Sequence, residues 1–101
     1  MIYIVVPTYN RLETCKSFIS DLEKQTYTDY HLVLIDHGKM KTGIEGPKIT
    51  RIESDVNGWA RAVNVGLKCV LNQADNDDVV LIINDDVILP KDYLWNIQES
   101  I

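Results

Sequence analysis

Three short runs of β-forming apolar residues, each followed at once by a polar cluster, constrain how this chain folds more than any other feature. The runs cover residues 2–6, 32–35 and 79–83, and the polar clusters begin at Pro7, Asp36 and Asn84. Runs of this length, rich in Val, Ile and Leu, are typical of strands, and the most apolar one, 79–83, predicts a strand buried on both faces. We expect the first strand to stop at Pro7, because proline cannot donate a ladder hydrogen bond.

Helical periodicity fills the intervals between these runs. The first helix is expected after Asn10, which forms the pattern of a capping box with Glu13. A second helix is expected to open at residues 57–58, and a third begins after Pro90 and continues to Ile101. The apolar stripe of the first helix is Leu12, Cys15, Ile19 and Leu22, and that of the second is Trp59, Val63, Leu67 and Val70.

These segments, with a weaker strand at 49–52 after a glycine-containing loop, follow the order β-α-β-β-α-β-α. Such alternation predicts an α/β fold, with a mainly parallel sheet of about four strands flanked by helices. Right-handed crossovers place the strands in the order 3-2-1-4. Ligands of open α/β sheets bind beyond the carboxyl ends of the strands, where the strand order reverses. The three polar clusters are therefore expected to converge on one edge of the sheet.

Length and charge exclude several classes of protein. The 101 residues predict one domain, 1–101, and ten Lys and Arg against fifteen Asp and Glu give a net charge of -5. This balance argues against a general binder of nucleic acid or of anionic membranes. No apolar stretch is long enough for a membrane span, and two cysteines make no disulfide framework. We expect a cytoplasmic protein, with membrane association only through a partner or a further part of the protein.

Three common nucleotide-binding or acidic-pocket patterns are absent from the sequence. It contains no G-x-x-x-x-G-K-[ST], and no G-x-G-x-x-G follows the first strand. A receiver-like pocket needs carboxylates after that strand, whereas this chain has Pro, Thr, Tyr and Asn there. A phosphate-binding loop, a dinucleotide fingerprint and a receiver site are therefore excluded.

The triplet Asn84-Asp85-Asp86 is the strongest positive signal. Adjacent carboxylates after a buried strand repel each other unless a cation offsets them. Mg²⁺ or Mn²⁺ accepts one or two carboxylates and completes its shell with water and substrate phosphates. An exposed Asp-rich turn explains the same residues without any ligand, because Asn and Asp are common in turns. The triplet alone does not separate the two interpretations.

Four motifs in order carry a family resemblance over essentially the whole chain. They are VVPTYNR at 5–11, VLID at 33–36, NGWARAVNVGL at 57–67 and LIINDDVILP at 81–90. Together they resemble family 2 glycosyltransferases, which have the GT-A fold; the last motif has the N-x-D form of rhamnosyltransferase-like members. The resemblance implies the Rossmann-like nucleotide-binding half of that fold. It also implies transfer of a sugar from a nucleotide diphosphate donor to a hydroxyl group of a glycan or other acceptor.

The resemblance assigns roles to individual residues. Asp86 binds the Mg²⁺ or Mn²⁺ beside the diphosphate, and Asp85 faces the ribose or the metal. Asp36 accepts a hydrogen bond from the imide N–H of uracil or thymine, which favours a UDP- or dTDP-linked donor. The nucleotide pocket at the end of the first strand is lined by Pro7, Thr8, Tyr9 and Arg11. Contacts to phosphate or sugar are implied for Arg61 and Asn64.

The sequence departs from the family pattern in three respects. A second carboxylate often follows the second strand, and here it is His37; the first position of the metal motif is Asn84 rather than Asp. The general base of inverting members comes from a second half of the fold, so no residue here is assigned that role. A binding half-domain without turnover, and a plain interaction domain with an incidental acidic turn, therefore stay open as alternatives.

The remaining residues of interest have structural interpretations. Cys15 and Cys69 are expected to be packing residues on helix stripes. We expect Trp59 to anchor the core rather than to serve as a stacking platform. Tyr93 and Trp95, on the last helix, are expected to pack on the sheet or on a further part of the fold. Left uncovered, they form an apolar patch that promotes self-association.

Overall fold

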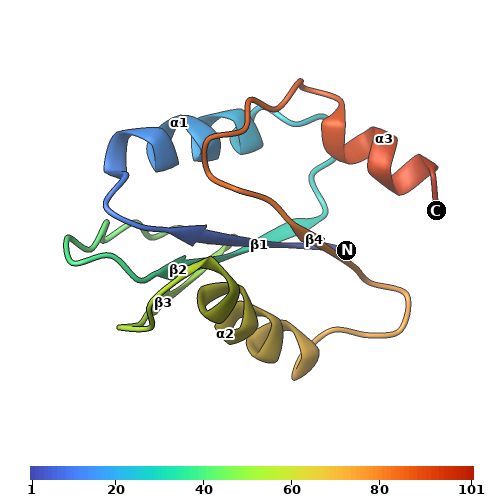
Figure 1. Cartoon of the computed structure of the whole chain (residues 1–101). Coiled ribbons are helices and arrows are strands. Elements are labelled where there is room, and N and C mark those ends of the chain that lie inside the picture. The colour runs from blue at the N-terminus through green and yellow to red at the C-terminus, as the bar shows by residue number, and fades with distance from the viewer.

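The computed structural model describes residues 1–101 as one α/β layer structure with a four-stranded parallel sheet (Figure 1). The strand order is β3-β2-β1-β4, which confirms the predicted topology. The elements are β1 (Ile2–Thr8), α1 (Leu12–Glu23), β2 (Tyr30–Asp36), β3 (Ile49–Glu53), α2 (Trp59–Leu71), β4 (Val79–Ile82) and α3 (Tyr93–Glu99).

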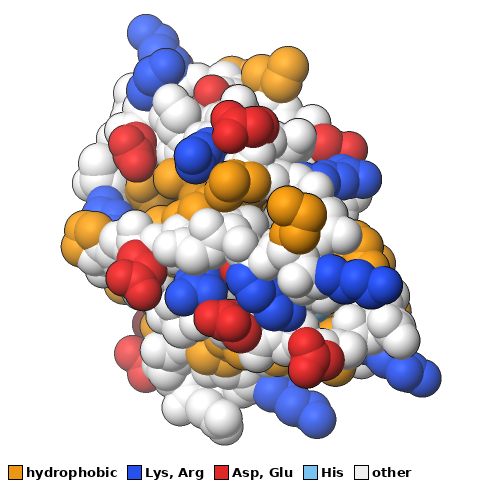
Figure 2. Space-filling view, turned by 90° about the vertical axis from the view of Figure 1, so that its left-hand side faces the viewer, with side chains coloured by type: hydrophobic (Ala, Val, Ile, Leu, Met, Phe, Trp, Pro, Cys, Tyr) orange, Lys and Arg blue, Asp and Glu red, His pale blue; other side chains and the backbone are white.

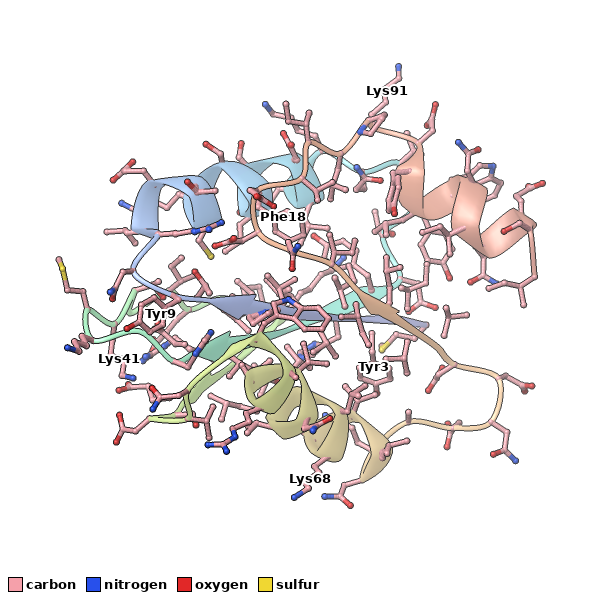
Figure 3. All side chains as sticks on the ribbon, viewed as in Figure 1. Tyr3, Tyr9, Phe18, Lys41, Lys68 and Lys91 are labelled. Atoms are coloured by element: carbon pink, nitrogen blue, oxygen red, sulfur yellow. The ribbon has the colours of Figure 1, made fainter.

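Helices cover both faces of the sheet, with α1 and α3 on one side and α2 on the other (Figure 1). Because side chains alternate along a strand, β1 and β2 contribute to two separate cores. Ile4 and Leu34 pack with Phe18 of α1, whereas Tyr3 and Val5 pack on the α2 face. Figure 3 shows Phe18 between α1 and the sheet and Tyr3 on the opposite side. The two cores bury β1 along its whole length.

The predicted end of β1 at Pro7 is wrong, because the strand continues to Thr8. Val5 accepts a hydrogen bond from Ile83 on the β4 side, and Thr8 accepts one from His37 on the β2 side. By alternation, the nitrogen of Pro7 faces the β4 side. The last paired residue of β4 is Ile82, opposite Val5, so the missing N–H of Pro7 costs no ladder bond.

The prediction that β4 is buried on both faces is also wrong. β4 is an edge strand, and α2 lies mainly over β1 and β2. Consequently Val80 and Ile82, on the α2 face, are 37% and 41% exposed. An apolar run predicts a strand, but it does not reveal whether another element covers each face of that strand.

The last helix, α3, ends at Glu99 rather than continuing to Ile101. Leu94 is fully buried against the α1 side of the sheet, and Tyr93 packs partly on the same core. Trp95 is about half exposed and its ring lies 6.1 Å from that of Tyr27. No helix in the structure combines the length and the apolar character that crossing a membrane requires.

Candidate functional site

A cavity of about 440 Å³ opens at the carboxyl ends of the strands, between the loops after β1 and β4 and the start of α2. Figure 2 shows this end of the molecule, where acidic and basic side chains are intermixed around apolar ones. All three predicted polar clusters contribute to the cavity, which lies at the predicted edge. The lining residues are Pro7, Tyr9, Arg11, His37, Gly58, Trp59, Asn84, Asp85 and Asp86.

The loop between β1 and α1 is held by Asn10, but not as the predicted helix cap. The N-cap position of α1 is Arg11 and has no side-chain cap hydrogen bond. Asn10 instead adopts a left-handed conformation, with φ of 54°, and its Oδ1 accepts a hydrogen bond from the Met40 N–H at 2.9 Å. Gly38 lies so close that a Cβ there would be 2.5 Å from the Asn10 nitrogen. The loops after β1 and β2 are therefore joined.

The carboxylates of Asp85 and Asp86, which share the guanidinium of Arg11, form the β4 side of the cavity. Asp85 is buried, and its Oδ2 accepts a hydrogen bond from the Thr8 hydroxyl at 2.9 Å. Arg11 Nη1 lies 3.4 Å from Asp85 Oδ1 and 3.6 Å from Asp86 Oδ2. Asp86 is more than half exposed to solvent. Thr8 itself is buried beneath the cavity, so its hydroxyl supports the carboxylate of Asp85.

An aromatic pair forms the β2 side of the cavity. The rings of Tyr9 and His37 are 5.2 Å apart, centroid to centroid, and tilted by 55°. His37 Nδ1 lies 3.3 Å from the Val56 carbonyl oxygen, which only accepts hydrogen bonds. Nδ1 therefore donates, and in the neutral ring Nε2 is left as an acceptor. Figure 3 shows Tyr9 at this end of the sheet, on the side where Lys41 also lies.

Asp36 does not line the cavity, although it immediately precedes His37. Alternation along β2 turns its side chain to the α1 face, where it is fully buried. Its Oδ2 accepts hydrogen bonds from the Thr42 N–H at 2.7 Å and the Thr42 hydroxyl at 2.9 Å, and Arg51 Nη1 lies 3.6 Å away. Its Oδ1 is buried without a partner. The assignment of a base contact to Asp36 stays a prediction, and the geometry favours His37.

Trp59 contradicts the expectation of a core anchor. It is 52% exposed, lines the cavity, and its indole Nε1 donates a hydrogen bond to Asn84 Oδ1 at 2.6 Å. Gly58, with φ of 90°, provides a backbone conformation that residues with a Cβ rarely adopt, directly before the helix. The buried residues of α2 are Ala62, Val63, Gly66 and Val70.

Two further predicted residues lie outside the cavity. Arg61 and Asn64 are exposed on α2 and are not among the lining residues. Their predicted contacts to phosphate or sugar stay predictions. The sequence placed the clusters that contain His37 and Asn84 at this edge but assigned neither residue a contact, and it did not predict Trp59 in the cavity wall. For His37 a signal existed, because adjacent strand residues face opposite sides of a sheet.

The acidic pair fits a hard divalent cation of the kind that the family resemblance implies. Asp85 and Asp86 offer carboxylate oxygens, and the shared Arg11 shows that their common field attracts positive charge. No group of three or more His, Cys, Asp and Glu side chains is placed to hold a metal. Asp85 and Asp86 are the two carboxylates that line the cavity. Mg²⁺ is usually held in this way, with water and substrate phosphates completing its shell.

Comparison with known proteins identifies the family of this chain. The sequence matches the profile of glycosyl transferase family 2 over residues 3–101. The chain belongs to glycosyl transferase family 2. This confirms the resemblance inferred from the four motifs. No curated protein matches the sequence of this family 2 chain.

Solved structures agree on the fold of the family 2 chain. The crystal structure of S. aureus TarS 1–349 has a TM-score of 0.73 and 21% sequence identity to it, and the match covers 97% of this chain and 31% of that one. At this identity the likeness shows the fold alone. The family 2 chain thus spans less than a third of the TarS chain that it matches.

Proposed function

We propose that the cavity is the donor site of a metal-dependent glycosyltransferase and that it binds a nucleotide diphosphate sugar. Membership of glycosyl transferase family 2 supports glycosyl transfer in general. The observation that carries the specific proposal is the pair of carboxylates, Asp85 and Asp86, that share Arg11 beside the aromatic pair of Tyr9 and His37. This arrangement offers opposite charges and ring faces in one cavity, as a nucleotide with a bound cation requires.

The strand order predicts where each part of the nucleotide lies in the cavity. His37 follows β2, Tyr9 follows β1, and the acidic pair follows β4, on the far side of β1. We place the nucleobase against Tyr9 and His37 and the diphosphate at Asp85 and Asp86. Stacking on Tyr9 is open to any base, because every base has a π face.

Selection of the base rests on acceptors near Tyr9. Uracil and thymine carry an imide N–H, which needs a hydrogen-bond acceptor. His37 Nε2 is such an acceptor when Nδ1 donates to Val56. The Oδ1 of Asp36 also lacks a partner, but Asp36 is fully buried and does not line the cavity. UDP and dTDP donors are therefore the first to test.

Asp86, with Asp85, would hold Mg²⁺ or Mn²⁺ on the diphosphate, and the ion supplies neutralisation of charge on the leaving group. Thr8 holds Asp85 in place through its hydroxyl, which leaves the other carboxylate oxygen facing Arg11. Arg11 is half exposed and can turn toward the phosphate oxygens once a cation offsets the acids. The acceptor hydroxyl would then attack the anomeric carbon as the carbon–oxygen bond to the diphosphate breaks, and its proton would pass to a general base outside the residues of this chain.

Thermal unfolding of the full chain tests this proposal. UDP, dTDP and GDP are each added with and without Mn²⁺, at about 100 times the dissociation constant, which stabilises by about 2.7 kcal/mol. For a domain of this size the midpoint should rise by on the order of 10 °C. Asp86→Ala should abolish the Mn²⁺-dependent rise. The matched control is Asp77→Ala, which removes the same charge just before β4, at the end of that strand away from the cavity.

The outcome separates the alternatives. A rise that needs Mn²⁺ and disappears only in Asp86→Ala supports the donor site. The same rise in both variants contradicts the assignment of the metal to Asp86. No rise with any nucleotide, from a chain that unfolds cooperatively, contradicts the donor site altogether and leaves an interaction domain with an acidic turn.

A further inference from the structure

The indole of Trp59 is fixed in the cavity wall by a residue from another element. Its only polar atom, Nε1, donates to Asn84 Oδ1 at 2.6 Å, across 25 positions of sequence. The ring is nevertheless 52% exposed, so it contributes little to the core. Buried or interfacial indoles commonly satisfy their N–H in this way while the ring face stays free for contact. Trp59 is thus an oriented and largely uncovered aromatic surface inside the cavity.

We propose that Trp59 is the platform on which the sugar ring of the donor packs, and that Asn84 is the residue that positions it. This inference rests on the proposed donor site and names the subsite for the transferred group. A pyranose presents C–H groups on its ring faces and hydroxyl groups around its rim. A fixed aromatic face with free space above it complements such a ring, and an exposed apolar surface in a cavity is typical of ligand contact.

The position of Trp59 favours the sugar over the base. Tyr9 and His37 already form an aromatic pair on the β1 and β2 side of the cavity. Trp59 donates a hydrogen bond to Asn84, which lies two residues after the end of β4 and directly before Asp85 and Asp86. A nucleotide sugar that places its base on the first side and its diphosphate at the acids extends its sugar toward Trp59.

The same hydrogen bond explains the departure at the first position of the acidic triplet. Asn84 is neutral, and its Oδ1 is engaged by the indole rather than turned to a cation. Asp85 and Asp86 are left as the acidic donors of the triplet. Asn84 is a positioning residue, because it acts on the sugar only through its hydrogen bond with Trp59.

The chain provides a matched control in its other tryptophan. Trp95 is 48% exposed, similar to Trp59, but it lies on α3, next to Tyr27 and away from the cavity lining. Trp95→Phe therefore leaves Trp59 as the sole tryptophan reporter. Trp59→Phe leaves Trp95 as a reporter that should not respond to a ligand in the cavity.

The experiment compares each nucleotide sugar with its own nucleoside diphosphate, in Mg²⁺ because Mn²⁺ quenches fluorescence. The probes are UDP-glucose and UDP-N-acetylglucosamine against UDP, and dTDP-rhamnose against dTDP, measured by calorimetry on the full chain. Trp59→Leu should weaken the tightest nucleotide sugar by about 3- to 10-fold. Affinity for the matching nucleoside diphosphate should stay unchanged. In Trp95→Phe, the nucleotide sugar should change the emission of Trp59 more than the diphosphate does.

Variants of Asn84 test the positioning role. Asn84→Leu removes the hydrogen-bond acceptor of Trp59 and, like Trp59→Leu, should weaken binding of the nucleotide sugar but not of the diphosphate. Asn84→Asp keeps an acceptor and should bind the nucleotide sugar as the wild type does. Equal losses for nucleotide sugar and diphosphate in Trp59→Leu would place the indole under the nucleoside and overturn the proposal. Unchanged binding in Trp59→Leu, or binding of diphosphates but of no nucleotide sugar, overturns it too. If neither UDP nor dTDP binds to the wild-type chain, the donor site itself fails.

Discussion

Asp36 and Asp85 stand at the carboxyl ends of the two strands that flank β1, and both carboxylates are almost fully buried. Their partners differ. Asp36 accepts the two hydrogen bonds that Thr42 donates, one from its backbone N–H and one from its hydroxyl, and it neighbours Arg51, whose side chain is only 18% exposed. Asp85 accepts one hydrogen bond from the buried hydroxyl of Thr8, and its positively charged partner, Arg11, lies at the rim of the cavity.

The two sets of partners determine which of the two buried acids can exchange a protein partner for a ligand. Arg11 is 52% exposed and can leave Asp85 for a ligand at small cost, because water solvates the released guanidinium. Thr42 and Arg51 belong to the packed loop and strand beside Asp36, so releasing them disrupts local structure. We therefore expect Asp36 to stabilise the fold and Asp85 to serve the ligand.

The largest expected effect comes from removing each acid in turn. Asp36→Ala leaves the Thr42 N–H and hydroxyl without an acceptor and should lower the free energy of unfolding by about 3 kcal/mol. Asp85→Ala should cost about 1–2 kcal/mol but should abolish the nucleotide-dependent gain in the free energy of unfolding. Urea unfolding of both variants, with and without UDP and Mn²⁺, measures the contrast. If Asp36→Ala is as stable as wild type but loses nucleotide binding, Asp36 serves the ligand and not the fold.

The second effect concerns Cys15, which lies near both acids and within hydrogen-bond reach of Thr8. Burial has the largest effect and raises the pKa of the thiol, the hydrogen bond with Thr8 lowers it, and the charges of Asp85 and Asp36 raise it further; the result is about 11, against an ordinary value of 9.0. The folded chain therefore holds this proton where the unfolded chain releases it. The resulting stability is present below about pH 9 and is lost between 9 and about 11; it amounts to about 3 kcal/mol.

Urea unfolding from pH 8 upward in wild type and in Cys15→Ala isolates this contribution, because tyrosine titration is common to both chains. The wild-type curve should fall more steeply than that of the variant as pH rises through the window. Parallel curves would mean that the thiol is not in the acidic, buried environment described.

The third effect concerns the contact between the loops that carry the two acids. A Cβ at Gly38 would meet the Asn10 nitrogen and Oδ1 at 2.5 Å each, so backbone must shift. Gly38→Ala should cost about 1–3 kcal/mol and weaken nucleotide binding, since Tyr9 and His37 are aligned by this contact. Gly46→Ala is the control, because its Cβ would meet only the flexible end of Ile49. Equal stability and affinity in both variants would show that the contact does not align the site.

The topology was predictable from the sequence because it depends on local signals. Apolar runs, helical periods and crossover handedness sufficed for the order β3-β2-β1-β4 and for the edge that carries the site. The exposure of Val80 and Ile82 was not predictable, because it depends on how far α2 extends over the sheet. Asn10 was misassigned because a capping pattern and a left-handed turn use the same residue type.

The site was predictable in part for a similar reason. Asp85 and Asp86 follow the apolar run directly, and their place at its carboxyl end follows from the strand alone. Choosing between Asp36 and His37 required the face of β2 that each side chain joins. The role of Trp59 depends on a hydrogen bond to Asn84, 25 residues away in the sequence, and no local pattern carries that information.

The smallest effect tests the exchangeable cation directly. Arg11→Gln removes a half-exposed partner from Asp85 and should lower the free energy of unfolding by about 1 kcal/mol at low salt. Because salt screens exposed pairs, the difference between wild type and variant should shrink toward zero at about 1 M NaCl. Arg51→Gln is the matched variant beside Asp36, where the cation is mostly covered. The loss of unfolding free energy in Arg51→Gln should be larger and should persist in salt.

If the loss in Arg11→Gln is equally large and equally insensitive to salt, Arg11 is as fixed as Arg51. Asp85 would then be a structural acid, and a divalent cation at this edge would have to displace part of the fold rather than a mobile side chain.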